Sequence, residues 1–314
     1  MKVGMSIPSS QSGVFHDGRR GIRIGGARYR TAVRALLVLS LLVIQSSLVW
    51  AWGNLAHQRV NAAAIENLPE PLRSYFQAHQ AYFSEHASEP DQLAQADPAE
   101  RPHHYTEIEG YGRPPFRAFE RRFVEDHWYP PASEREHGDS IWQIERFTLR
   151  LAQDLRRHRW QDANHDALFA AHYAADLTQP LHTVINFDGK LTNQLGIHAR
   201  FETELVRDLA ATWTFQPKPP VFIPDLRARI FHELVESYSH SNEVFAADRQ
   251  AAATGGYLDP NFLLRFEQQA GPLALRQLSD AANFVSSLWY TAWTEAGKPL
   301  LPAASTMSRV RNGM

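Results

Sequence analysis

The segment 167–177, with the sequence ALFAAHYAADL, decides the fold class of this chain. Alanine has the highest helix propensity, and Pro180 follows closely, so we expect a helix that ends before this proline. His172 and Asp176 stand four positions apart within the segment. This spacing places both side chains on one face of a helix. The segment therefore predicts a helix that holds an imidazole beside a carboxylate.

Helical patterns continue on both sides of this segment. Apolar residues recur in steps of three and four over 144–155, with arginines between them, which is typical of an amphipathic helix facing a core. The ranges 199–211, 225–247 and 272–296 repeat these signals, and Pro272 suits a first helical turn. Most of the chain is thus expected to be helical.

Strand-like alternation is nearly absent, and the best short candidate, 183–186, is weak. No internal repeat of fixed period is visible, and no loop resembles a flexible linker between independent domains. We therefore predict an all-α fold. It consists of one mostly helical domain over residues 52–297, followed by a disordered tail over 298–314.

The composition limits the chemistry that this domain can carry out. The 314 residues include 15 histidines and no cysteine. Disulfides, thiolate zinc sites, iron–sulfur clusters and thiol nucleophiles are therefore excluded. The chemistry must use histidines, carboxylates, hydroxyl groups or a metal held by nitrogen and oxygen atoms.

The first 51 residues have the parts of a secretory signal peptide. Seven of the 32 basic side chains precede an apolar run over 35–44, and Ala51 stands at the junction. The run is too short to span a bilayer, although 48–50 could extend it into an uncleaved membrane anchor, which is the alternative. We predict that residues 1–51 are removed during export, and that the mature protein is periplasmic or secreted and begins at Trp52.

Further histidines follow the helical pair at spacings that suit a metal site. His182 lies shortly after Pro180, and His198 with Glu202 repeats the four-residue pairing. Imidazole and carboxylate groups presented in this way are what zinc binds where thiolates are absent. One such pair alone would more often be a solvated ion pair. Two pairs with a histidine between them favour a metal site.

The predicted new N-terminus strengthens this interpretation. Cleavage would free the α-amine of Trp52, and an α-amine, with a reference pKa of about 7.7 to 8.0, binds metal once it is deprotonated. His57 follows within about one helical turn. The alternative is that Trp52 is simply the first aromatic residue of the core.

The ordered series resembles the superfamily of zinc-dependent phospholipases C and single-strand-specific nucleases, whose mature chains start at a tryptophan that binds zinc through its amine and carbonyl. The resemblance runs from Trp52 to about Glu202 through motifs, and more loosely over the C-terminal helices. It implies an all-helical fold with three zinc ions at the bottom of a cleft. The implied ligands are Trp52, His57 and Asp176 for one ion; Asp91, His104, His172 and Asp176 for a second; and His182, His198 and Glu202 for a third, more exposed ion.

Two of the implied ligands have rivals nearby in the sequence. Asp91 lies thirteen residues before His104, and Asp97 competes with it. His103 competes with His104. We prefer His104 because the family's ligand is followed directly by an aromatic residue, here Tyr105.

Such a metal cluster suits phosphoester chemistry. Two or more divalent ions a few ångströms apart activate a water molecule and clamp the oxygens of a phosphoryl group during in-line displacement. They also neutralise negative charge, so a largely acidic chain can still bind a phosphodiester. We expect phosphodiester hydrolysis by a metal-activated water, with Asp91 as the catalytic residue that orients this water or acts as its base.

The sequence divides between two substrate classes. Two features resemble the nuclease branch: the spacing of five residues from Trp52 to His57, and the motif Gln-Pro-Leu-His at 179–182. Glu202, where nucleases usually carry aspartate, and the 16-residue step that ends at His198 resemble the phospholipase branch. The spacing alone leaves both classes open.

Tyr105 and Glu107 stand where the resemblance implies binding of a base, and stacking on a tyrosine contributes about 1 to 3 kcal/mol per base. Phospholipases have a similar local pattern. We slightly favour single-stranded nucleic acid or nucleotides as the substrate, with phospholipid head groups as the first alternative and a non-catalytic zinc-binding helical protein as the second. The sequence predicts no nucleotide cofactor and indicates no obligate protein partner.

Overall fold

The computed structural model describes residues 52–133, 135–209 and 212–302. All of them belong to one compact unit that spans Val49–Met314. The predicted signal peptide lies outside the described residues, as do residues 303–314 of the predicted tail. Both predictions therefore remain predictions.

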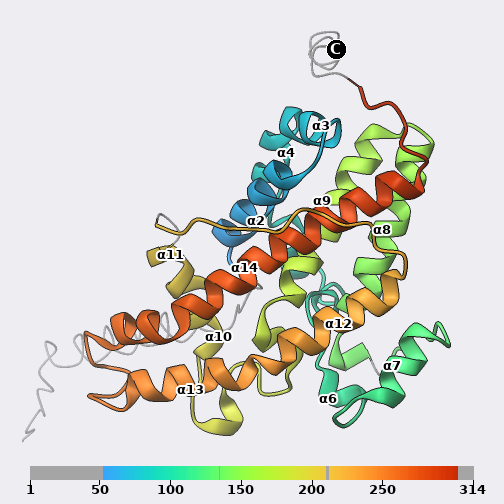
Figure 1. Cartoon of the computed structure of the whole chain (residues 1–314). Helices are drawn as coiled ribbons and strands as arrows, with labels where there is room; N and C mark the ends of the chain where they lie inside the picture. Colours follow the sequence, from blue (N-terminus) through green and yellow to red (C-terminus); the bar gives the residue numbers. More distant parts are fainter. Residues whose placement is uncertain (1–51, 134, 210–211, 303–314) are drawn as a thin grey trace, which may run out of the picture. The chain divides into compact units, whose positions relative to one another are not determined.

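The described part of the chain contains helices and no strand, which confirms the all-α class (Figure 1). The short candidate at 183–186 is wrong, because a 3-10 turn that begins at Pro180 runs into irregular backbone there. The α-helices are α2 (Asn54–Asn67), α3 (Leu72–Ala78), α4 (Gln80–Glu85), α5 (Glu89–Ala96), α6 (Ile108–Tyr111), α7 (Arg117–Val124), α8 (Ser140–Arg156), α9 (Trp160–Leu177), α10 (Ile197–Ala199), α11 (Leu205–Leu209), α12 (Leu226–Ser239), α13 (Ser241–Ala252) and α14 (Phe262–Glu295). Short 3-10 segments are η2 (Arg101–His104), η3 (Arg135–His137), η4 (Pro180–Thr183) and η5 (Lys190–Thr192), and η6 (Arg200–Glu204) is π-helical.

Helix α9 forms the centre of the fold, and α14 crosses it in Figure 1. From Ala163 onward nearly every α9 side chain is buried, because its many alanines let neighbouring helices approach closely. The indole of Trp289, on α14, donates a hydrogen bond to the carbonyl of Ala167 at 3.0 Å. The same indole ring stacks on Phe76 of α3, with ring centroids 4.4 Å apart. The predicted helix of 167–177 is thus the buried element on which the other layers pack.

Two predicted helix boundaries are wrong. Helix α14 begins at Phe262 and continues through Pro272, although a proline inside a helix costs about 3 kcal/mol. Phe262 and Phe266 are buried before the proline, and their burial offsets this cost. The helix expected over 225–247 is instead two helices, α12 and α13, which meet at His240.

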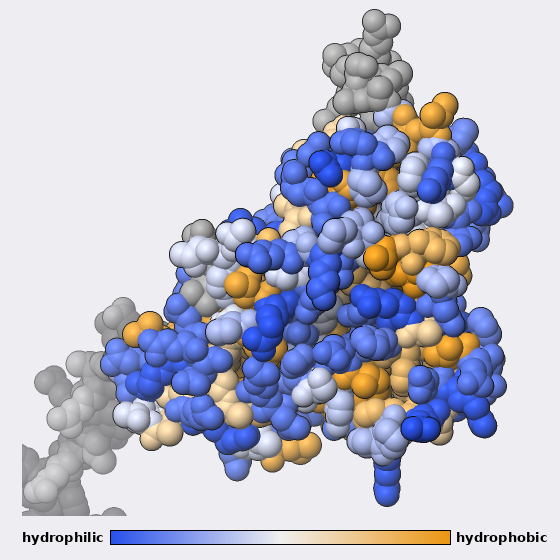
Figure 2. All heavy atoms as spheres, viewed as in Figure 1, coloured by the Kyte–Doolittle hydropathy of each residue, from blue (hydrophilic) through white to orange (hydrophobic). Residues whose placement is uncertain are grey.

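The surface in Figure 2 is covered mostly by hydrophilic side chains, with hydrophobic ones in small separate groups. None of the helices in the described ranges combines the length and the apolar character that a bilayer span needs.

Candidate metal centre

The structure brings the eight predicted side-chain ligands together. They form three buried groups, and within each group the ligand atoms lie within 4.8 Å of one another. Each group could hold a metal ion. We call the first two groups, which have His172 in common, the shared cluster, and the remaining one the third group. The shared cluster consists of His57, Asp91, His104, His172 and Asp176, and the third group consists of His182, His198 and Glu202.

Four separate elements supply the shared cluster. His57 comes from α2, Asp91 from the first turn of α5, and His104 from the end of η2. His172 and Asp176 come from α9, one helical turn apart. The rings of His57 and His172 stack with their centroids 3.9 Å apart, so α2 and α9 meet at the cluster.

Asp176 lies between the two halves of the shared cluster. Its Oδ1 is 3.3 Å from Nε2 of His57. Its Oδ2 is 3.0 Å from Nδ1 of His104 and 3.4 Å from Nε2 of His172. Asp91 faces the second half alone, with Oδ1 3.4 Å from Nε2 of His172 and 3.5 Å from Nδ1 of His104. This is the arrangement that a bridging carboxylate needs.

Several ligand atoms of both groups are buried without a hydrogen-bond partner. They include Nε2 of His57, Oδ1 of Asp91, Oδ1 of Asp176 and Oε1 of Glu202. Unpaired buried polar atoms are rare because each costs about 1 to 3 kcal/mol. A divalent ion would satisfy these nitrogen and oxygen atoms, so the residues fit the metal that the sequence predicts.

Backbone carbonyls orient two of the imidazoles. Nδ1 of His172 donates to the carbonyl of Ala87 at 2.9 Å, and Nδ1 of His182 donates to the carbonyl of His104 at 2.6 Å. Each bond keeps a proton on Nδ1, so Nε2 is the nitrogen that faces the other ligands. Such outer partners are the usual companions of metal-binding histidines.

The third group is built on one short stretch of chain. His182 follows Pro180 in η4, His198 lies in α10, and Glu202 lies in the π-helical turn η6. Nε2 of His198 is 2.8 Å from Oε2 of Glu202 and 3.1 Å from Nε2 of His182. Single π-helical turns occur preferentially at functional sites.

Gln179 supports the third group and was not predicted to do so. Its side chain is fully buried. Oε1 accepts a hydrogen bond from the backbone N–H of Leu181 at 2.6 Å, and Nε2 donates to Oε2 of Glu202 at 3.3 Å. The sequence showed Gln179 only as part of a family-like motif, because nothing in its spacing reveals the contact with Glu202.

The protonation of the shared cluster reflects its two carboxylates. Burial lowers the pKa of His172, but the charges of Asp176 and Asp91 outweigh it and raise this pKa to about 9. Burial would raise the pKa of Asp176, but His172, His104 and His57 together hold it well below its usual range. Burial and the charge of His172 lower the pKa of His57. Without metal, the cluster therefore holds a proton on His172.

The third group behaves differently. Burial raises the pKa of Glu202 to about 8, against the opposing hydrogen bond from His182. Burial lowers the pKa of His198 to about 4, because the nearby carboxylates Asp188 and Asp176 compensate only partly. Without metal, this group is a neutral acid beside a neutral imidazole near neutral pH.

Neither rival ligand reaches these groups. Asp97 is exposed, and its Oδ1 accepts a hydrogen bond from the backbone N–H of Ala99 at 2.9 Å. His103 turns to Asp139, with Nδ1 2.6 Å from Oδ1. The structure thus places Asp91 and His104, and not their rivals, with the other ligands.

Trp52 and the two substrate-binding candidates lie near the groups. Trp52 is buried, with its ring centroid 5.6 Å from that of Phe201, which precedes Glu202. The role of its amine stays a prediction.

The two substrate-binding candidates contact the segment 136–137. Tyr105 donates from its hydroxyl to the carbonyl of Glu136 at 3.2 Å, and Oε2 of Glu107 is 3.1 Å from Nδ1 of His137. Both are partly buried, and burial raises the pKa of Tyr105 to about 12 and that of Glu107 above its usual value.

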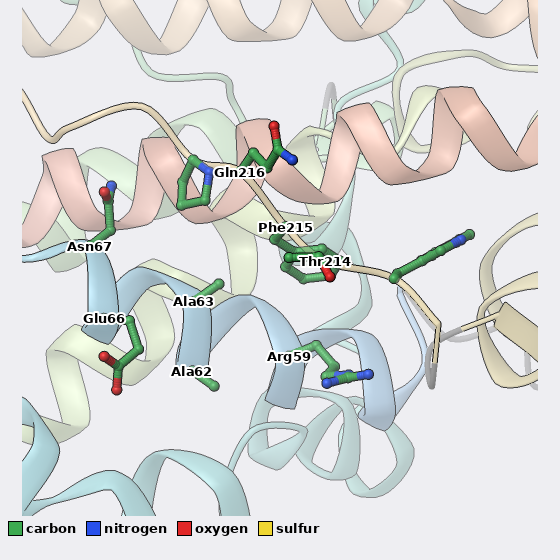
Figure 3. A pocket seen from close by; sticks show the side chains of 10 residues that line it. Arg59, Ala62, Ala63, Glu66, Asn67, Thr214, Phe215 and Gln216 are labelled. Atoms are coloured by element: carbon green, nitrogen blue, oxygen red, sulfur yellow. The ribbon is translucent and has the colours of Figure 1, made fainter.

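A surface pocket of about 630 Å³ lies away from this chemistry, between α2 and the segment 213–217 (Figure 3). Arg59 and Glu66 of α2 and Phe215 of the segment contribute to its lining. None of the predicted ligands lines it. The pocket therefore adds nothing to the candidate metal centre.

No family model matches the chain, and no curated protein matches it significantly.

Proposed function

We propose that this chain is a zinc-dependent phosphodiesterase, related to the zinc-dependent phospholipases C and single-strand-specific nucleases. One observation carries the proposal. Eight histidine and carboxylate side chains, spread from α2 to η6, converge in three buried groups of nitrogen and oxygen ligands. Ordinary helical packing does not require such groups, because burying a charge is costly unless it is paired or binds a metal.

Zinc ions held in such groups would activate water and neutralise the charge of a phosphoryl group. The two carboxylates of the shared cluster then have different tasks. Asp176 is fully enclosed and lies against three imidazoles, which suits a bridging ligand. Asp91 contacts only two imidazoles, and its side chain keeps 6 % exposure. We therefore assign Asp91 as the residue that orients the attacking water or takes its proton.

The test combines metal content with activity. Purified protein is analysed for bound zinc, then assayed on single-stranded RNA and DNA, on phosphatidylcholine and on a soluble chromogenic phosphodiester. We expect up to three zinc ions per chain and hydrolysis that is lost with a chelator and restored by zinc. His232→Ala, which changes an exposed histidine outside the groups, should leave both readouts unchanged.

The outcomes separate the candidates. Cleavage of single-stranded nucleic acid would support the nuclease-like activity that the sequence slightly favours, and cleavage of phosphatidylcholine would support a phospholipase C. Bound zinc without hydrolysis of any of these substrates would leave a non-catalytic zinc-binding protein. Absence of bound zinc would refute the proposal.

Export is part of the same proposal. Processing after Ala51 would free the amine of Trp52, which the resemblance assigns to the same ion as His57 and Asp176. Sequencing the N-terminus of the exported protein tests this, because any start other than Trp52 contradicts the amine ligand.

A further inference from the structure

An exposed apolar loop connects two members of the third group. We define the apolar loop as residues 185–195, between His182 and His198. Leu191 is 72 % exposed and Leu195 is 68 % exposed, and Ile185 and Phe187 are 42 % and 43 % exposed. Single exposed leucines are common, but four large apolar side chains in one short loop form a patch.

Hydrogen bonds within the apolar loop fix its shape. The backbone N–H of Leu191 donates to Oδ1 of Asn186 at 2.8 Å, and that of Gln194 donates to the carbonyl of Gly189 at 2.9 Å. Gly189 has φ +73°, and a Cβ there would lie 2.6 Å from the carbonyl oxygen of Gln194. This tight turn fixes the backbone around Leu191, whose side chain is exposed.

Buried groups anchor the end of the apolar loop to α13. Gln194 is buried, and its Nε2 donates to Oδ2 of Asp248 at 2.8 Å. The guanidinium of Arg200 donates to the carbonyls of Leu195 and Gln194, and to Asp248. The loop therefore lies beside α13 (Figure 1) and cannot fold its leucines inward without breaking this buried network.

A second exposed leucine turn shares this anchor. The hydroxyl of Tyr257 donates to Oδ2 of Asp248 at 2.7 Å, and the guanidinium of Arg200 lies 4.6 Å from the centroid of its ring. The next residue, Leu258, is 97 % exposed. One buried network thus presents apolar side chains from two loops.

The charges of the apolar loop complement an anionic interface. Lys190 is exposed at its tip, beside Leu191. The acid of the loop, Asp188, turns back to accept a hydrogen bond from the backbone N–H of Gly196 at 3.0 Å. The tip therefore presents aliphatic side chains with an ammonium group, which suits phosphate head groups above acyl chains.

The same composition argues against a nucleic acid. Proteins that bind single strands use aromatic platforms in basic grooves, and the apolar loop has one aromatic residue, Phe187, and one lysine. Aliphatic side chains such as Leu191 and Leu195 do not stack on bases, but they partition well into acyl chains.

We propose that the apolar loop docks into a phospholipid surface, with Leu191 and Leu195 inserted between the lipids and Lys190 among the head groups. The ring centroid of Phe187 lies 5.8 Å from that of His198, so docking would bring the third group to the lipid surface. This last step rests on the proposed function, whereas docking itself requires no hydrolysis.

The cysteine-free chain allows a direct test with a single label. Leu191→Cys is labelled with an environment-sensitive fluorophore in the full chain and mixed with vesicles of phosphatidylcholine and phosphatidylglycerol. We expect a blue shift and a several-fold increase in emission. Leu149→Cys, at a leucine of α8 that is 49 % exposed, is the matched control and should show neither change. If residues 1–51 alone held the chain on the vesicles, the label at 191 would stay in water and the proposal would be wrong.

A second variant measures the contribution to binding. Leu191→Ser combined with Leu195→Ser should weaken vesicle binding by about a hundredfold, because each buried leucine contributes about a factor of ten. Zinc content and hydrolysis of a soluble phosphodiester should not change, which separates this test from that of the proposed function. Unchanged vesicle binding, loss of oligonucleotide binding instead, or conversion of a dimer to a monomer would each overturn membrane docking.

Discussion

The shared cluster and the third group contain the same kinds of ligand, yet they hold their protons differently. In the shared cluster, two carboxylates face three imidazoles, and their charge keeps a proton on His172, with a pKa of about 9. In the third group, one carboxyl faces two imidazoles, and burial dominates. Glu202 keeps its own proton, with a pKa of about 8, while the pKa of His198 falls to about 4.

This difference in protonation predicts how each region depends on metal. The shared cluster already holds the opposite charges of His172 and Asp176 side by side without an ion, so removing one of them leaves the other buried and unpaired. In the third group, Glu202 and His198 are both neutral without metal near neutral pH, and Glu202 becomes charged when an ion replaces its proton. We therefore expect substitutions in the shared cluster to damage the fold and metal binding together, and substitutions in the third group to affect metal binding alone.

The largest effect is expected for Asp176→Asn. This change removes the carboxylate that lies against His57, His104 and His172, so both ions of the shared cluster should be lost. Metal analysis should show at most one remaining ion. Activity should fall on the order of a thousandfold, equivalent to about 4 kcal/mol. The free energy of unfolding of the metal-free protein should fall by about 3 kcal/mol, because a buried pair is broken.

Asp248→Asn is the matched control for this variant. Asp248 is a fully buried aspartate that pairs with Arg200 and lies outside the three groups. Its substitution should lower stability in denaturant titrations without loss of zinc. Equal zinc loss in both variants would show that Asp176 acts only through the fold.

Glu202→Gln should have a smaller and more selective effect. The metal-free protein already holds Glu202 as a neutral acid near neutral pH, and glutamine has nearly the same shape. Unfolding experiments on the metal-free protein should therefore show a loss of no more than about 1 kcal/mol, the net contribution of one hydrogen bond. Metal analysis should show the loss of one ion. A large loss of stability would contradict the neutral state of the third group.

Gln179→Leu should weaken the third group without abolishing it. The change removes the donor to Oε2 of Glu202, and the loss of such an outer partner typically reduces metal affinity about 10- to 100-fold. Competition with a chelator measures this affinity, and the ions of the shared cluster should remain bound. Gln153→Leu, at an exposed glutamine of α8, should leave every ion in place. An unchanged third ion in Gln179→Leu would remove Gln179 from the site.

Much of the candidate site could be predicted because its ligands follow local periodicity. His172 with Asp176, and His198 with Glu202, are four apart, so one helical turn brings each pair together. Joining the two pairs with Asp91 and His104 required the family resemblance. The sequence alone does not show that η2 and α5 lie against α9.

Other features depend on contacts that no local pattern reveals. Pro272 looked like a helix start, but burial of Phe262 and Phe266 extends α14 past it. Gln179 supports Glu202 across 23 positions of sequence, and the apolar loop stays outward because a buried network holds Gln194. Tertiary contacts decide these outcomes over local propensity.

The smallest expected effect separates the two regions by pH. Metal binding requires the ligands to lose their protons, so the affinity of each region should rise with pH until its proton is gone. For the third group the rise should end near the pKa of Glu202, about 8, because His198 is already neutral above its pKa of about 4. For the shared cluster the rise in affinity should end near the pKa of His172, about 9, because Asp176 is ionised throughout this range.

Calorimetry of zinc binding in buffers with different ionisation enthalpies counts the released protons. Glu202→Gln should abolish the proton release that ends near pH 8. If this variant still releases that proton, the proton of the third group is held by another residue.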